Sequence, residues 1–451
     1  MPKLTDIYQN GMSPEALAAS VLRSQGIDIE NPHLPIDPFR IMRRCGVVYQ
    51  FIGAKNLEGI YLVPEDEKDV PLVGINCHRP ITRQRFSAAH ELCHHLKDRS
   101  SQICPIGANQ NAMEKYAEQF ASALLMPLPA LRQRAARFLQ DEQLDLQAAL
   151  HLSVEFGVSF GACARRLAYV LRVLPFENPK ELGQRIKKFK PDKVKAQLGI
   201  ELEPWELLAQ AADSYEFFYQ IRPDIAWYIF KNNFIFNENR MEGVDLEEDE
   251  VAEIVADLRL HGSDSEYCRA EYDNIIQVTG HSAIYDYICS TQDNLDIYKL
   301  TKLNRLLFQY TPVPDTGGST RRHNVMVQGA SFEAADWRDI MPRLIKLAPV
   351  TAQLLERRED CSVSEFISEA VKIHHEITQI HPFADGNGRC SRAFLNWLLR
   401  LKGLPPIYIK HKEKERYYEA LTQADTKGDF RPLAKIVIKE LFRTMMEINK
   451  H

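Results

Sequence analysis

The chain has 451 residues, 45% of them hydrophobic, and a formal net charge of −5. This length is enough for two or three domains with buried cores, and a pI near 6.3 argues against a general nucleic-acid binder. We expect no signal peptide or membrane span, because the N-terminus is polar and no apolar run approaches the ~18 residues that a span needs. The 9 cysteines form no C-x-x-C pair, which indicates free thiols in a reducing compartment and predicts a cytoplasmic protein.

Residues 90–94 read His-Glu-Leu-Cys-His, an H-E-x-x-H string. Histidines at i and i+4 share one helix face, where His90 and His94 can hold Zn²⁺ while Glu91 acts on a bound water. A surface helix rich in His and Glu also produces such a string, so its surroundings decide between the two interpretations.

These surroundings resemble the ImmA/IrrE family of zinc metallopeptidases. The segment 83–89 precedes the string and the segment 120–127 follows it, while 59–62 and 74–76 have the character of two strands of the small sheet in such domains. The resemblance implies an N-terminal α+β, zincin-like metallopeptidase domain over residues 1–175. A domain that binds zinc but serves as a sensor or docking module is the alternative.

A catalytic zinc needs a third protein ligand, which the resemblance places on the following helix. Glu114 fits the family position better, whereas Glu118 lies four residues further on the same helix face. This chain has Tyr116 where the family usually has an acidic residue, so the choice between the two glutamates stays open. The implied assignment adds Glu114 to the two histidines, with Glu91 as the base.

Two segments link this domain to the rest of the chain. Residues 144–172 have the spacing of two helices about a Gly-Val-Ser turn, and we expect them to close the N-terminal core. Few basic residues occur there, which argues against a DNA-reading helix-turn-helix. Residues 176–225 contain several prolines and the basic run 185–190, and predict a helical connector with a solvated basic face.

Residues 381–392 read His-Pro-Phe-Ala-Asp-Gly-Asn-Gly-Arg-Cys-Ser-Arg. Asp385 can hold a hard cation such as Mg²⁺ through a carboxylate oxygen. Gly386 and Gly388 can adopt backbone angles closed to other residues, so amides around Asn387 can converge on a phosphate at a helix N-terminus. The segment therefore predicts a phosphate-binding turn that opens a helix.

The other charged residues of this segment complete a site for phosphoryl or nucleotidyl transfer. Arg389 and Arg392 lie three apart, on one helix face, where both guanidiniums can bind phosphate oxygens. His381 can act as the general base, because its ordinary pKa is near the operating pH. A glycine turn with solvated arginines is the alternative, but a short turn rarely needs His, Asp and two Arg together.

The segment resembles the Fic motif, H-P-F-x-(D/E)-G-N-G-R-x-x-R, at every specified position. The resemblance implies a mainly α-helical Fic domain over residues 226–451, with a core at 280–445. It also implies transfer of AMP from Mg²⁺-bound ATP to a Ser, Thr or Tyr hydroxyl of a target protein, with His381 as base and Asp385 on Mg²⁺. The implied nucleotide-binding residues are Phe383, Gly386, Asn387, Gly388, Arg389 and Arg392.

Fic domains also carry a β-hairpin flap that aligns the target by strand pairing. Residues 317–321 resemble its glycine turn, and residues 324–329 resemble its alternating strand. The resemblance thus implies one hairpin in an otherwise helical domain.

Many Fic proteins restrain the second arginine of the motif, here Arg392, with a glutamate from an inhibitory helix written (S/T)-x-x-x-E-(G/N). Residues 236–243 resemble this pattern. The resemblance implies an inhibitory helix within 236–255, with Glu242 as the residue that blocks productive ATP binding.

The match to the inhibitory pattern has one departure, because Glu238 occupies the Ser/Thr position. Glu271, followed by Tyr272, is a second candidate but lacks the family's Gly or Asn. The remaining alternative is that Glu242 and Gly243 only end a helix on a solvated acidic face.

Together these features predict a protein adenylyltransferase restrained in cis and fused to a zinc metallopeptidase module. The expected ligands and partners are ATP with Mg²⁺, Zn²⁺, a target protein, and a peptide or repressor cut by the peptidase. No membrane or nucleic-acid partner is expected, and a homo-oligomer is compatible with the sequence. One alternative is a Fic enzyme that transfers phosphate or phosphocholine, or removes AMP. Another is a protease-regulated stress, toxin or phage-response switch in which the peptidase is the main activity.

Overall fold

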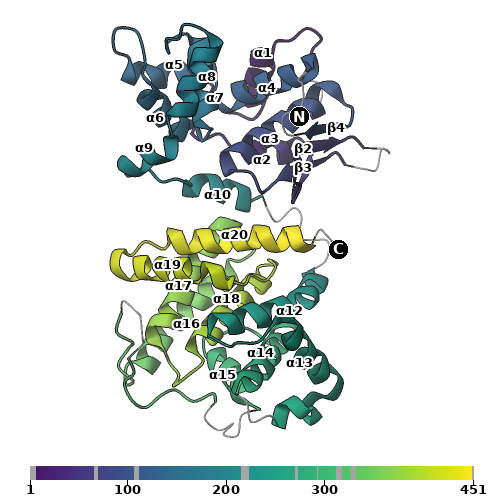
Figure 1. Ribbon diagram of the computed structural model, residues 1–451, viewed down its shortest axis with the longest axis vertical. Helices are drawn as coiled ribbons and strands as arrows, with labels where there is room; N and C mark the ends of the chain where they lie inside the picture. The colour runs from purple at the N-terminus through teal and green to yellow at the C-terminus, as the bar shows by residue number, and fades with distance from the viewer. Residues whose placement is uncertain are drawn as a thin grey trace. The chain divides into compact units, whose positions relative to one another are not determined.

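A computed structural model describes residues 7–64, 70–105, 111–214, 223–269, 273–291, 293–310, 317–326 and 332–448. The chain divides into two compact units, Met1–Phe218 and Tyr219–His451, whose elements are labelled in Figure 1. No described helix combines the length and the apolar composition that crossing a membrane requires.

The N-terminal unit is an α+β fold with a four-stranded sheet of order β1-β3-β2-β4. β1 pairs in parallel with β3, whereas β2 pairs antiparallel with both β3 and β4, so β4 forms an edge. The predicted strands at 59–62 and 74–76 are confirmed within β2 and β3. The four strands are β1 (Val48–Ile52), β2 (Leu57–Leu62), β3 (Leu72–Asn76) and β4 (Gln102–Pro105).

α3 (Ile81–Cys93) is the central helix of this unit and packs on β2 and β3 as well as on its helical neighbours α2 (Pro38–Arg44) and α4 (Ala112–Leu125). Its buried face includes the small residues Ala88 and Ala89, which permit close packing. The buried Arg85 fixes the helix by donating to the Gly157 carbonyl (3.1 Å) and the Ile36 carbonyl (2.6 Å).

The other helices of this unit pack around that centre. Gly157, in the left-handed region at φ 64, ends α6, and Ser159 caps α7, so the predicted pair of helices about a turn is confirmed. α10 packs on α2 and α3. These helices are α1 (Pro14–Ser24), α2 (Pro38–Arg44), α4 (Ala112–Leu125), α5 (Leu128–Ala135), α6 (Leu146–Phe156), α7 (Phe160–Arg166), α8 (Pro179–Lys188), α9 (Pro191–Gln197) and α10 (Trp205–Ala212).

The C-terminal unit is mainly helical, and α17 and α18 pack together at its centre. Ser362 and Glu365 form a capping box at the start of α17, and α18 buries Phe394 and Trp397. Its helices are α12 (Pro223–Met241), α13 (Glu248–His261), α14 (Asp273–Ser290), α15 (Lys299–Phe308), α16 (Ile340–Glu356), α17 (Val363–Ile380), α18 (Asn387–Leu401), α19 (Lys414–Lys427) and α20 (Arg431–Ile448).

The expected inhibitory range 236–255 is divided between two helices. α12 ends at Met241, and Gly243 follows at φ 89, an angle that favours glycine and turns the chain out of the helix. Glu247 and Glu250 then form a capping box that begins α13. Glu242 therefore lies at a helix end, directly before the turn.

The described part of the expected flap, residues 317–326, forms no strand, and residues 327–329 lie outside the described part of the chain. Arg321 explains the irregular course. Its backbone amide donates to the Pro382 carbonyl (2.9 Å) and its Nε to the His381 carbonyl (2.8 Å), so this segment is bound to the loop after α17. The hairpin itself stays a prediction.

Candidate functional site

The residues of the H-E-x-x-H string lie at the C-terminal end of α3. His90 and Glu91 belong to its last turn, and His94 begins the π-helical turn η2 (His94–Asp98) that continues it. An Asp98 carboxylate oxygen lies 2.7 Å from His94 Nδ1 and orients the ring. As a result, His94 Nε2 lies 3.1 Å from His90 Nε2.

Glu114 joins this pair from the first turn of α4, where Asn111 caps the helix. Its Oε2 lies 3.1 Å from His90 Nε2, and its Oε1 lies 3.6 Å from His94 Nε2. Among the described residues, Glu118 is not part of this group of potential metal ligands. The structure thus brings together His90, His94 and Glu114 of the residues that the sequence singled out.

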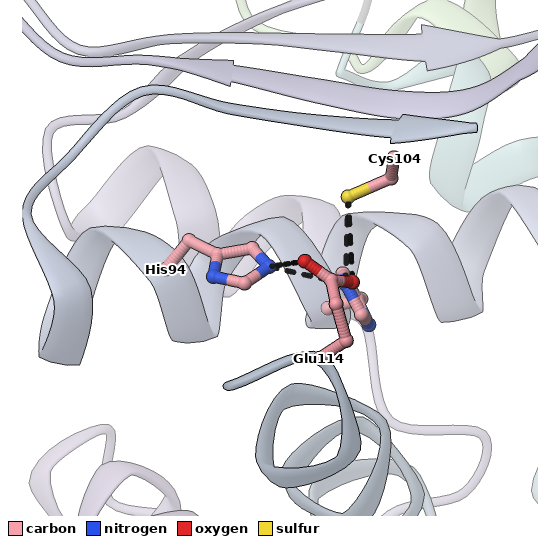
Figure 2. Close-up of side chains that lie close together, drawn as sticks. His94, Cys104 and Glu114 are labelled. Atoms are coloured by element: carbon pink, nitrogen blue, oxygen red, sulfur yellow. Dashed lines mark hydrogen bonds and ion pairs between the residues drawn. The ribbon is translucent and has the colours of Figure 1, made fainter. Parts of the chain in front are cut away.

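Cys104 of β4 completes the cluster and was not predicted. Its sulfur lies 3.6 Å from His90 Nε2 and 3.8 Å from Glu114 Oε2. Figure 2 shows it pointing from the strand toward Glu114. One ligand atom from each of the four residues lies within 4.8 Å of the others. A tetrahedral zinc site holds N and O donors about 3.3 Å apart, so the donor set fits zinc.

Glu91 is buried beside this cluster, with 1% of its surface exposed. Neither carboxylate oxygen meets hydrogen-bond geometry with a described residue, although the Cys104 thiol lies beside it. Burial raises the pKa of this carboxyl above its usual value. Gly59 of β2 makes room for the side chain, because a Cβ there would lie 3.1 Å from Glu91 Cδ and closer to Oε1.

The motif at 381–392 forms the loop between α17 and α18. His381 ends α17 at φ 49, and Gly386 caps α18 at φ 80, so the turn needs two left-handed residues. A Cβ on Gly386 would also collide with the Leu307 side chain. The loop therefore presents the N-terminus of α18 as the sequence predicts.

Polar side chains hold this loop in shape. Asn387 accepts from the Phe383 amide and donates to the Phe383 carbonyl, both at 2.9 Å. Asn304 of α15 donates to the Asp385 carbonyl (3.1 Å) and accepts from the Gly318 amide (2.8 Å). Asn304 was not predicted, because it lies in a distant helix outside the motif.

The reactive groups of the motif differ in exposure. The Asp385 side chain is 71% exposed and has Arg389 NH2 at 3.4 Å, so its carboxylate is accessible to a cation. His381 is half-buried, and burial together with the charge of Arg321 lowers its pKa below 6.5. The neutral imidazole, which can accept a proton, is therefore the favoured form at pH 7.

Arg392, the second arginine of the motif, is buried and bound by two carboxylates from α12 and its end. Its NH2 donates to Glu242 Oε1 at 2.6 Å, and its Nε donates to Glu238 Oε2. A Cβ on Gly388 would lie 2.8 Å from Glu242 Oε1, so a larger residue there would displace the Glu242 carboxylate from its present position. In the sequence, Glu238 stands where the inhibitory pattern has a Ser or Thr hydroxyl. In the structure, its carboxyl group is a second partner of Arg392.

The electrostatics of the two glutamates differ. Burial raises the pKa of Glu238 despite the charge of Arg392, because only 1% of this residue is exposed. Burial also acts to raise the pKa of Glu242, but the charge and hydrogen bond of Arg392 outweigh it and lower the pKa. The alternative candidate, Glu271 with Tyr272, lies outside the described residues.

The N-terminal unit thus has an α+β fold with a cluster of potential metal ligands. The C-terminal unit has a helical fold with a loop suited to binding phosphate. Residues 28–168 match the IrrE N-terminal-like domain, and residues 294–399 match the Fic/DOC family. The chain carries an N-terminal IrrE-like domain and a C-terminal Fic/DOC domain, and it is distantly homologous to Fic adenylyltransferases.

Proteins named as Fic adenylyltransferases are similar to part of this chain. The protein adenylyltransferase Fic of Drosophila willistoni is 35% identical over 130 residues, which cover 28% of this chain and 23% of the relative. The protein of the same name from Nematostella vectensis is 38% identical over 87 residues, 19% of this chain and 20% of the relative. The chain therefore spans about a quarter or less of the length of these relatives.

Among solved structures, Fic-1 from C. elegans aligns over 70% of this chain and 91% of that chain, with 17% identity and a TM-score of 0.44.

The contact between Gly59 and Glu91 can be tested by the substitution Gly59→Ala. The added methyl group collides with a buried carboxylate, and we expect a loss of about 1–3 kcal/mol in the free energy of unfolding. Urea-induced unfolding of the full chain measures it. Gly183→Ala in α8 is the matched control, because a Cβ there meets no atom within 4 Å. Equal stability of Gly59→Ala and the unmodified protein would show that β2 does not confine Glu91.

Proposed function

We propose that the chain is a protein adenylyltransferase that is restrained in cis, and that its IrrE-like domain is a zinc peptidase. The proposal rests foremost on the Fic-type loop and the carboxylates that bind its second arginine, Arg392. The similarity to proteins named as Fic adenylyltransferases supports transfer of AMP rather than of another group.

In the proposed reaction, His381 takes the proton of a target hydroxyl. The hydroxyl oxygen bonds to the α-phosphorus of ATP, the bond to the bridging oxygen of the β-phosphate breaks, and pyrophosphate leaves. The exposed Asp385 carboxylate binds the Mg²⁺ that accompanies the nucleotide. Amides at the start of α18, together with Arg389, bind the phosphates.

The proposed restraint follows from the hydrogen bonds that Arg392 makes. A guanidinium that neutralises the terminal phosphate must have free N–H groups directed at it, whereas NH2 and Nε here donate to Glu242 and Glu238. The two carboxylates also repel a triphosphate electrostatically. Lys414 of α19 donates to the Met241 carbonyl at 2.7 Å and so holds the end of α12 in place.

In the N-terminal domain, His90, His94 and Glu114 would hold zinc, which supplies Lewis acidity for hydrolysis in sites of this kind. Glu91 would accept the proton released in hydrolysis. Its buried carboxyl has a raised pKa, which suits a group that takes up and returns a proton.

Release of the restraint is the main test of the transferase. Glu242→Gly removes a charge-assisted hydrogen bond of about 1.5–3 kcal/mol, so we expect auto-modification to rise by about tenfold or more. Because Glu238 still binds Nε of Arg392 in this variant, the double variant Glu238→Ser/Glu242→Gly should show more auto-modification than the single variant. ATP labelled at the α-phosphate measures transfer of AMP, and ATP labelled at the γ-phosphate detects transfer of phosphate.

Two further variants make this experiment specific. His381→Ala in the double variant should abolish labelling, and Glu248→Gly, at an exposed glutamate of α13, should leave it unchanged. No gain of label in either released variant would contradict the restraint. Labelling only from the γ-phosphate would replace adenylylation with phosphorylation.

The pH dependence of transfer tests His381 as the base. The neutral imidazole is the active form, and its pKa is lowered from 6.5 by burial. The rate of the Glu242→Gly variant at saturating ATP should therefore fall to half of its maximum at a pH below 6.5. An acidic midpoint at or above pH 6.5 would contradict this role.

The third zinc ligand can be identified from metal content. Glu114→Gln removes a carboxylate from the cluster, and we expect zinc affinity to fall by at least about tenfold. Glu118→Gln, one helical turn away, should retain the metal. Zinc per chain is measured by mass spectrometry after dialysis against a competing chelator, and the reverse pattern would assign the site to Glu118.

A further inference from the structure

The metal-type cluster contains one donor more than a hydrolytic zinc site needs. His90, His94 and Glu114 already form a three-ligand set, and such sites leave the fourth position open to solvent. Cys104 comes from the opposite side of the cluster, on the edge strand β4. Only 8% of this residue is exposed, and Figure 2 shows its sulfur directed into the cluster.

Five distances between donor atoms of the cluster are close to those expected around one zinc ion. Zinc bonds of about 2.0–2.2 Å to N or O and about 2.3 Å to S place N and O donors about 3.3 Å apart, and sulfur about 3.6 Å from them. His90 Nε2 lies 3.1 Å from both His94 Nε2 and Glu114 Oε2, whereas His94 Nε2 lies 3.6 Å from the other carboxylate oxygen, Glu114 Oε1. The sulfur lies 3.6 Å from His90 Nε2 and 3.8 Å from Glu114 Oε2.

Glu91 provides an independent observation at the same place. Its carboxylate is 1% exposed and has no hydrogen bond of normal geometry among the described residues. The thiol of Cys104 is its neighbour in the cluster. The sulfur therefore occupies the side of the cluster from which Glu91 would act.

We propose that Cys104 is the fourth protein ligand of this zinc site and closes the peptidase centre in the conformation observed. The inference rests on the zinc site proposed above and adds its regulation. On binding, the thiol releases its proton to solvent, and the thiolate sulfur bonds to the metal. Four protein ligands give the closed arrangement of a structural zinc site, so hydrolysis requires the sulfur to leave.

The position of Cys104 in the sheet offers a route for this release. β4 is an edge strand and pairs with β2. Displacement of this one strand would carry the sulfur away, while His90, His94 and Glu114 stay in place on α3, η2 and α4.

Cobalt substitution tests the sulfur ligand directly. The full-length protein is freed of metal with a chelator and titrated with Co²⁺, because a thiolate bound to Co²⁺ absorbs strongly in the near ultraviolet by charge transfer. We expect this band at one Co²⁺ per chain in the unmodified protein. Cys104→Ala should lose it and bind Co²⁺ at least about tenfold more weakly. Cys93→Ala, a buried cysteine outside the cluster, should keep it.

A second measurement uses the unmodified protein and does not depend on how a variant folds. Alkylation of Cys104 by N-ethylmaleimide, followed by mass spectrometry of its peptide, should be at least about tenfold slower with Zn²⁺ than without it. If the metal binds stoichiometrically but neither the thiolate band nor this protection is seen, the role of Cys104 is overturned and the three-ligand site remains intact. If neither Co²⁺ nor Zn²⁺ binds, the proposed zinc site fails, and the role of Cys104 fails with it.

Discussion

The buried guanidinium of Arg392 and its two carboxylates organise the Fic site. Burying ions costs several kcal/mol each unless they are paired with good geometry, and removing one partner leaves an uncompensated charge. The contacts to Glu238 and Glu242 therefore fix the end of α12 against the start of α18. Gly388 leaves room for the Glu242 carboxylate beside Arg392. In the proposed restraint, these same contacts keep the arginine from binding a phosphate.

Two carboxylates on one cation also explain why the glutamates behave differently. Glu238 lies deeper, and burial raises its pKa, whereas Arg392 lowers that of the more accessible Glu242. In the proposed restraint, Glu242 opposes a nucleotide most directly, and Glu238 binds the guanidinium at the more buried side.

Local sequence could predict the parts of the two sites that lie within one segment. Helix spacing places His90 and His94 on one face, and the glycines of 381–392 predict the turn that opens α18. The spacing of four between Glu238 and Glu242 also carried a signal, since it puts both carboxylates on one helix face. The family pattern, which has a hydroxyl at the first position, does not predict the second carboxylate.

The remaining features depend on contacts between distant segments, which no local period encodes. Asn304 and Cys104 reach their sites from α15 and β4 only after the chain has folded. The flap segment also depends on a contact with a distant part of the chain. Its glycine turn and alternation favour a hairpin, but the bonds of Arg321 to the carbonyl groups of the motif loop fix the described residues in an irregular path.

The two proposed restraints rest on the same principle and lie in separate units. In each proposal, a protein group takes the place that a reactant would need: carboxylates on Arg392 in one and the thiolate of Cys104 in the other. Every residue of the first lies in Tyr219–His451, and every residue of the second lies in Met1–Phe218. Each can therefore be released by a change within its own unit. Under the proposed restraint, removing the carboxylates from Arg392 would be sufficient on electrostatic grounds, so opening the Fic site would not require cleavage by the proposed peptidase.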